Sequence, residues 1–170
     1  TGKLDISTLV LVPRVVESLR IPVIGGGGVS DGRGLVALLA LGAQGVIMGT
    51  RLLATREAPI HEALKQALVQ ASELDTMLVM RSIGATHRVW TNAAAKKIAE
   101  LEANQAGLPE ILNIATGEKA KKMYREGDLD VGIISCGQGV GMAHDIPTVK
   151  ELFDRIMSEA QEVARGLSAN

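Results

Sequence analysis

The chain has 170 residues, of which 46% are hydrophobic and 22% charged, and its formal net charge is −1. This composition builds an apolar core and excludes intrinsic disorder, and the lack of a basic excess argues against a nucleic-acid partner. A single cysteine excludes an internal disulfide and a zinc site made of four cysteines.

The sequence contains no membrane-span pattern. An apolar span needs about 20 residues, and the longest candidate, residues 35–48, is interrupted by Gly42 and Gln44. We therefore expect no membrane partner and a cytoplasmic location. The chain begins at Thr1 without a methionine or a signal-peptide apolar region, and we expect it to be part of a longer protein.

The first predicted elements are a helix and a strand. Apolar residues recur with helical spacing over residues 6–19, where Pro13 predicts a kink or a late start. Residues 21–24 form a short apolar run that is typical of a buried parallel strand. Four glycines, residues 25–28, follow this strand and predict a loop.

A second helix and strand follow the glycines. Asp31 is an N-cap residue type ahead of a helix over residues 34–41, and residues 45–48 form another buried strand that ends at Gly49 and Thr50. A crossover of this length predicts parallel pairing. The loops after the two strands should then lie side by side.

The remainder of the chain is predicted to be mostly helical. Thr148 and Glu151 fit a capping box at the start of the last helix. The predicted segments are helices at 60–72, 93–104, 110–115, 118–125 and 149–165, a short extended segment at 76–80, and a glycine-rich loop at 132–141.

The run of glycines points to a bound phosphate. Each glycine costs backbone entropy, but together they let a ligand approach the backbone N–H groups, and the helix N-terminus that follows adds partial positive charge. The P-loop pattern fails because Arg33 stands where a lysine is required. The dinucleotide-binding pattern fails because its third glycine and its ribose-binding acid are absent.

The pattern that remains is the phosphate site of (β/α)8 barrels, which is built from the loops after strands 7 and 8. A single glycine-rich turn is more often structural, whereas two turns that lie one βα unit apart favour phosphate binding. Tight turns without a ligand are the alternative. The predicted phosphate contacts are Gly26, Gly27, Gly28, Gly49 and Thr50.

Two segments resemble a known family. The segments IPVIGGGGVSDGRG (residues 21–34) and LGAQGVIMGTRLLAT (residues 41–55) resemble the nitronate monooxygenase (2-nitropropane dioxygenase-like) family of FMN-dependent barrels. Flavin-dependent enoyl-ACP reductases of the same superfamily share these motifs. Further matches at residues 8–16, 127–130, 137–138 and 146–147 extend the resemblance along essentially the whole chain, and those in the C-terminal part are less specific.

The resemblance implies a set of site residues. In that family, the positions that match Gly27, Gly28, Gly49 and Thr50 hold the FMN phosphate, and Gln138 lies on the flavin or substrate side. The family's catalytic histidine belongs to a Gly-Gly-His-x-Gly motif. The start of this chain resembles the residues that follow that histidine, so we expect the catalytic base, together with strands 1 to 6, to lie just before Thr1.

The resemblance also implies a fold and an activity. We expect an α/β fold in which residues 1–56 are the last βα units (strands 7 and 8) of a TIM (β/α)8 barrel and residues 57–170 are a mostly helical extension and lid. The implied activity is oxidation of alkyl nitronates with O2. The alternatives are an NAD(P)H-dependent enoyl-ACP reductase and a fragment that is inactive without the upstream strands. A homodimer is a further expectation.

The remaining candidate residues have structural interpretations, and some also have a functional one. Arg51 could contact the phosphate or form a structural ion pair, and His144 with Asp145 could approach the flavin or lead into the last helix. Cys136 is better explained by buried packing than as a nucleophile. His61 and His87 are expected at the surface or in helix packing, and neither has metal-ligand spacing. Lysines at 96, 97, 119, 121 and 122 are expected on solvated helix faces.

Overall fold

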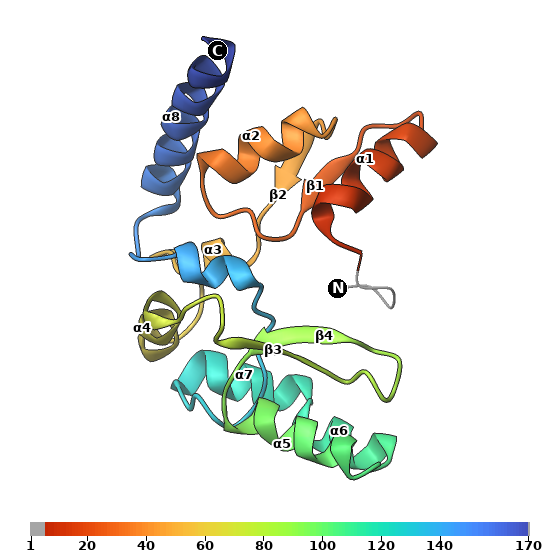
Figure 1. Cartoon of the computed structure of the whole chain (residues 1–170). Helices are drawn as coiled ribbons and strands as arrows, with labels where there is room; N and C mark the ends of the chain where they lie inside the picture. The colour runs from red at the N-terminus through yellow and green to blue at the C-terminus, as the bar shows by residue number, and fades with distance from the viewer. Residues whose placement is uncertain (1–5, 170) are drawn as a thin grey trace.

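The computed structural model describes residues 6–169 and arranges them around two separate two-stranded sheets (Figure 1). The first sheet lies in the N-terminal part of the chain, and the second belongs to the larger part that follows. The expectation that the chain begins just after a catalytic histidine rests on Thr1, Gly2 and Lys3, which lie outside the described residues.

The N-terminal unit is the predicted βαβ unit. After helix α1 (Thr8–Ser18), strands β1 (Ile24–Gly26) and β2 (Gly45–Ile47) pair in parallel, with Ile24 opposite Gly45 and Gly26 opposite Ile47. Helix α2 (Gly32–Ala40) connects the two strands and starts at the Asp31 N-cap. The prediction of parallel pairing is therefore confirmed.

The first strand is shifted from its predicted position, because two of the four glycines belong to it. A Cβ atom at Gly25 would lie 2.9 Å from Leu38 Cδ1, and one at Gly26 would lie 2.6 Å from Ile47 Cγ2. Glycine is thus required for close packing on α2 and β2. Only the last two glycines remain for the loop.

The second sheet contains a strand that the sequence analysis missed. Strand β3 (Thr76–Val79) was predicted as an extended segment, and β4 (His87–Trp90) pairs with it in antiparallel fashion. Residues 133–136 continue the pairing on the other side of β4, where Trp90 N–H donates to the Ile134 carbonyl at 3.1 Å and Val89 forms a bridge with Ser135.

Four helices pack around the second sheet: α4 (Glu62–Gln70), α5 (Ala93–Ala103), α6 (Leu108–Ile114) and α7 (Gly117–Glu126). One buried cluster joins Val79 and Val89 of the sheet to Ile98 of α5. A second cluster joins Leu68 of α4 to Met123 of α7. The extension is therefore mostly helical, as expected, but it is built on a β-hairpin.

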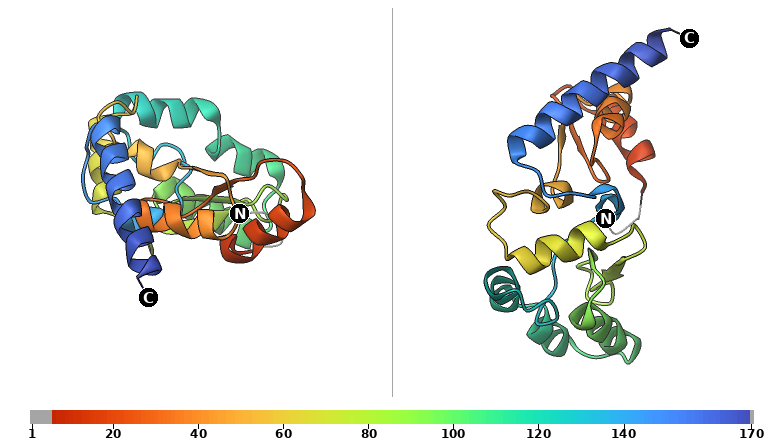
Figure 2. Two further views of the ribbon diagram at one scale, coloured as in Figure 1. Left: turned by 90° about the horizontal axis from the view of Figure 1, so that it is seen from above. Right: turned by 90° about the vertical axis from the view of Figure 1, so that its left-hand side faces the viewer.

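The C-terminal helix returns to the N-terminal unit. After the short helices α3 (Thr50–Leu53) and η1 (Gln138–Met142), the long helix α8 (Val149–Ser168) runs alongside α2 (Figure 2). Thr148 and Glu151 form the predicted capping box at its start. No helix within residues 6–169 combines the length and apolar character needed to cross a membrane.

One face of the N-terminal unit is apolar and exposed. Ile24 of β1 is 57% exposed, Ile47 of β2 is 66% exposed, and Leu9 of α1 is 69% exposed. Neighbouring strand residues such as Gly25 point the other way and are buried against α2. No segment among residues 6–169 covers these three side chains, which is unusual for a folded unit.

Candidate active site

A cavity of about 900 Å³ lies between the two sheets. The glycine loops form one wall, and β4 with the segment at residues 134–138 contributes another. The structure brings five predicted residues together on this cavity: Gly27, Gly28, Gly49, Thr50 and Gln138. The two predicted loops therefore lie side by side, although they are 20 residues apart in the chain.

Gly26 does not share this position. It is a strand residue of β1, and a side chain at this position would point toward Ile47 of β2. Gly26 does not line the cavity, because the chain turns toward it only after this residue, and a phosphate contact of Gly26 stays a prediction.

The loop glycines leave open space beside the backbone. Gly27 has φ +96° and Gly28 has φ +78°, a left-handed conformation that side chains rarely adopt. A Cβ atom at Gly28 or at Gly49 would have no described atom within 4 Å. Exposed backbone N–H groups beside open space fit a phosphate group, as the predicted FMN requires.

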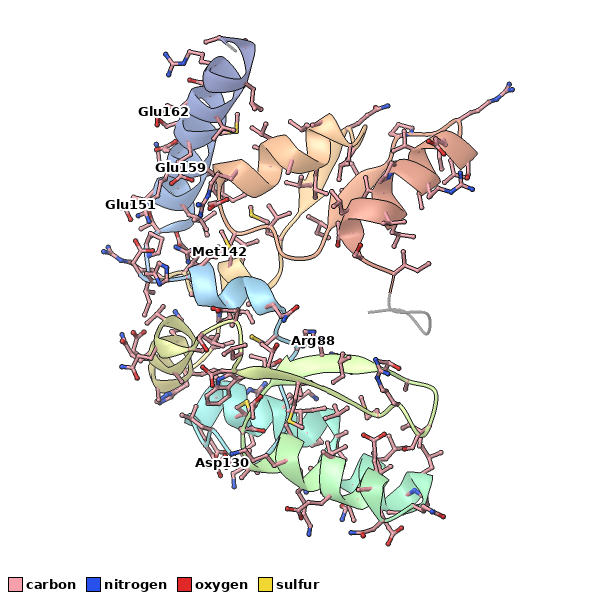
Figure 3. The ribbon with its side chains drawn as sticks, viewed as in Figure 1. Arg88, Asp130, Met142, Glu151, Glu159 and Glu162 are labelled. Carbon is pink, nitrogen blue, oxygen red and sulfur yellow. The ribbon has the colours of Figure 1, made fainter. Side chains whose placement is uncertain are left out.

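The N-terminus of α2 does not contribute to this site. The Gly32 N–H donates to Glu159 Oε2 at 2.9 Å, and the Gly34 N–H donates to Asp31 Oδ1 at 3.0 Å. Figure 3 shows Glu159 on the side of α8 that faces α2. Two carboxylates therefore occupy the positive end of this helix, and our expectation that it would attract the phosphate is wrong.

A hydrogen bond links the second loop to the Gln138 segment. The Gly137 N–H donates to Thr50 Oγ1 at 2.8 Å. Nearby, the buried Ser30 hydroxyl donates to the Gly139 carbonyl at 2.8 Å. These contacts fix the start of η1 against both loops and keep Gln138 at the cavity.

The wall across from the glycines contains polar residues that the sequence analysis did not select. His87 lies on β4, and its Nε2 atom is 2.7 Å from Ser135 Oγ. Burial lowers the pKa of His87. His87 is partly buried on a strand, so the helix-packing interpretation is wrong for it, and strand β4 was not predicted. Its partner is 48 residues away, so no local pattern could reveal the pair.

The other candidates have structural roles. Arg51 is 2% exposed, and its Nη2 atom lies 2.6 Å from Asp145 Oδ1, while Arg155 binds the other oxygen of that carboxylate at 2.7 Å. Burial lowers the pKa of Arg51 although the Asp145 charge opposes this. The ion-pair interpretation of Arg51 is confirmed. His144 and Asp145 lead toward α8 and line a separate, smaller cavity.

Cys136 and His61 also match their structural interpretations. Cys136 is 1% exposed, and burial raises the pKa of its thiol to about 12. His61 caps α4, accepting a hydrogen bond from the Ala63 N–H at 3.1 Å. Among residues 6–169, no group of three or more acidic, cysteine or histidine side chains is placed to hold a metal ion.

Solved structures of known proteins resemble the structure of this chain. The structure of FabK from Thermotoga maritima matches with a TM-score of 0.91 and 36% identity, over 97% of this chain and 52% of that one. The nitroalkane oxidase of Streptomyces ansochromogenes matches with a TM-score of 0.78 and 27% identity, over 95% and 46% of the two chains.

Sequence relatives agree with the structural ones. A probable nitronate monooxygenase of Staphylococcus haemolyticus is 33% identical over 92% of this chain and 43% of its own length. An indene-carboxyl-CoA dehydrogenase of Rhodococcus jostii is 30% identical over 91% and 54%. The chain thus spans about half the length of these relatives. The family model for nitronate monooxygenase matches residues 1–159, and the chain belongs to the nitronate monooxygenase family.

Proposed function

We propose that this chain supplies the FMN phosphate site and part of the active-site wall of an oxidoreductase that oxidises alkyl nitronates with O2. One observation carries the proposal: Gly27, Gly28, Gly49 and Thr50 meet at one cavity, at the carboxyl ends of two parallel strands. This is the position of the phosphate site in (β/α)8 barrels.

The residues of this chain would bind and orient rather than transfer protons. Backbone N–H groups of the glycine loops would hold the phosphate, and Gln138 would face the flavin or the substrate. FMN would supply the redox chemistry when bound. The proposed arrangement treats residues 1–56 as the last barrel units and residues 57–170 as the extension and lid, with the catalytic histidine contributed from outside this chain.

Oxygen consumption tests the proposed activity. The complete translation product containing this chain, loaded with FMN, should consume O2 when propionate 3-nitronate is added and should release nitrite. A flavin-loaded protein that consumes no O2 with this or a simple alkyl nitronate would contradict the proposal. An oxygen electrode and a colorimetric nitrite assay provide the two readouts.

A second candidate is the reduction of an enoyl thioester by NAD(P)H. The TM-score of 0.91 with FabK and the relative that is named for a carboxyl-CoA substrate favour it. The same flavin-loaded preparation would then oxidise NAD(P)H only when an enoyl thioester is present, and O2 uptake would not depend on nitronate. The two activities can be compared in one experiment.

A further inference from the structure

The loop at Gly49 and Thr50 has little stability of its own. Helix α3, which follows Gly49, has four residues, and the Leu52 and Leu53 N–H groups donate to the Gly49 carbonyl at 3.0 and 3.3 Å. A single helical turn is marginal in water. The backbone of Gly49 and Thr50, which both line the larger cavity, is therefore fixed by the parts of the chain that hold α3.

Arg51 is the buried anchor of this helix. Its side chain is 2% exposed, and its Nη1 atom donates to the Ala54 carbonyl at 3.0 Å, just after α3 ends. Its Nη2 atom lies 2.6 Å from Asp145 Oδ1, and Nη1 also donates to the Asp145 carbonyl at 3.3 Å. Among the described residues, Arg51 lines the smaller cavity and not the larger one. It holds the backbone beside Thr50 without reaching the space where we place the phosphate.

The charge of Arg51 depends on the carboxylate of Asp145. A buried charge is costly unless an opposite charge is paired with it. Asp145 is itself only partly buried, and Arg155 of α8 donates to its second oxygen from Nη2 at 2.7 Å. This hydrogen bond lowers the pKa of Asp145, although burial opposes the change. The carboxylate therefore stays charged at neutral pH and joins α8 to α3.

Backbone contacts beside Asp145 join the same two segments. The Arg56 N–H donates to the Pro147 carbonyl at 2.9 Å, and the Val149 N–H lies 2.9 and 3.0 Å from the two carboxylate oxygens of Glu57. These contacts do not involve the Asp145 side chain. A substitution that removes only its charge therefore leaves the two segments paired, and its effect is concentrated on the buried end of Arg51.

We propose that Asp145, oriented by Arg155, is a positioning residue that fixes the loop at Gly49 and Thr50 through the buried Arg51. The inference rests on the proposed FMN phosphate site and holds for either candidate activity, because both use the flavin. Binding groups give the highest affinity when neighbouring contacts hold them in the bound geometry in advance. Asp145 then controls the affinity for the phosphate end of the flavin, although its side chain does not line the larger cavity.

FMN and riboflavin, which differ only in the phosphate group, provide the test. The flavin-free complete translation product is titrated with each, and binding is followed by flavin fluorescence. Asp145→Asn should weaken FMN binding about tenfold, as loss of one charged hydrogen bond implies. Riboflavin binding should not change. A purely electrostatic effect has the opposite sign, because removing a negative charge near the site strengthens the binding of a phosphate.

Asp154→Asn is the matched control. Asp154 is an exposed residue of α8 that pairs with Lys150, so this variant loses the same charge without touching Arg51. It should bind both flavins as the unmodified protein does. Arg155→Gln leaves the pair of Arg51 and Asp145 in place, so it should weaken FMN binding less than Asp145→Asn does, again without changing riboflavin binding.

Hydrogen exchange tests the positioning role without a flavin. The Leu52 and Leu53 amides report the opening of α3, since both donate to the Gly49 carbonyl. In the flavin-free protein, Asp145→Asn should speed exchange in a peptide that covers α3, and Asp154→Asn should not. Peptides from α5, which packs on the second sheet, should exchange at the unmodified rate in both variants. Mass spectrometry measures these rates.

The outcomes separate this inference from the proposed function. Equal weakening of FMN and riboflavin binding by Asp145→Asn, unchanged or tighter FMN binding, or unchanged exchange in α3 would overturn the positioning role. If Asp145→Asn does not fold, unchanged FMN binding and unchanged α3 exchange in Arg155→Gln overturn it. If the unmodified protein binds no FMN, the proposed function fails, and the exchange rates still decide whether Asp145 fixes the loop.

Discussion

Burial determines the chemistry of the single thiol in this chain. Cys136 lines the cavity but is 1% exposed, and burial raises the pKa of its thiol from 9.0 to about 12. The thiolate is the nucleophilic form. Cys136 is therefore protonated at any physiological pH, which excludes it as a nucleophile in its folded environment.

Alkylation kinetics check this conclusion. We expect iodoacetamide to label Cys136 far more slowly in the folded protein than in denaturant at the same mildly alkaline pH, and mass spectrometry measures both rates. Because the folded-state pKa is raised, the stability associated with the neutral thiol is present below pH 9 and is lost as the pH rises toward 12. Equal labelling rates in the two states would contradict the buried position.

At the level of single residues, the sequence allowed a prediction where a residue's conformation or role depends only on its neighbours in the chain. Gly28 was predictable because only a backbone without a side chain easily adopts φ +78°. The sequence could not decide between the two roles of Arg51, because its partner Asp145 is 94 residues away. The same limit applies to His87 and Ser135, which meet only after three distant segments pair.

The packing of α8 on α2 depends on one glycine. A Cβ atom at Gly32 would lie 2.5 Å from Glu159 Cβ and 2.7 Å from the Ile156 carbonyl oxygen, and it would also contact the Ala160 backbone nitrogen. All three neighbours belong to helix α8, and two of the contacted atoms are backbone atoms that cannot move aside locally. The two helices must separate if this position carries a side chain.

Gly32→Ala should therefore destabilise the protein by about 2 kcal/mol, the cost of an overpacked interface. Gly166→Ala is the control, because Gly166 lies in α8 with open space around it, and alanine should stabilise that helix by up to about 1 kcal/mol. Urea unfolding of both variants measures the changes. A Gly32→Ala variant as stable as the unmodified protein would show that α8 does not pack closely on α2.

Elements were predictable where the pattern is local. Helix α8 has a capping box and a regular apolar stripe, so it was found with its correct start. Strand β4 was missed because the sequence His-Arg-Val-Trp has no clear alternation, and the strand exists through pairing with β3 and residues 133–136. The carboxylate cap that Glu159 gives to α2 spans 127 residues and leaves no local signature.

At the scale of the whole molecule, two observations bear on the same proposal: the exposed apolar face of the N-terminal unit and the greater length of the relatives. Ile24 and Ile47 lie on the face of β1 and β2 that α2 does not cover. The chain covers 52% of FabK and 43% of the staphylococcal relative. We propose that the remaining barrel strands pack on this face and complete the cavity, as in a closed barrel.

Flavin retention tests the central claim most directly, since every role proposed for the glycine loops depends on a bound phosphate. The complete translation product is mixed with FMN and desalted, and its visible absorption spectrum is recorded. Gly49→Ala places a methyl group in the open space of the second loop, whereas Gly117→Ala, at the start of α7, adds one in open space away from the cavity.

The account predicts that the unmodified protein and Gly117→Ala keep stoichiometric flavin with its two visible bands. Gly49→Ala should lose most of it while unfolding at the same urea concentration as the unmodified protein. A folded, unmodified protein that keeps no flavin would contradict the account, as would a Gly49→Ala variant that binds FMN as tightly as the control.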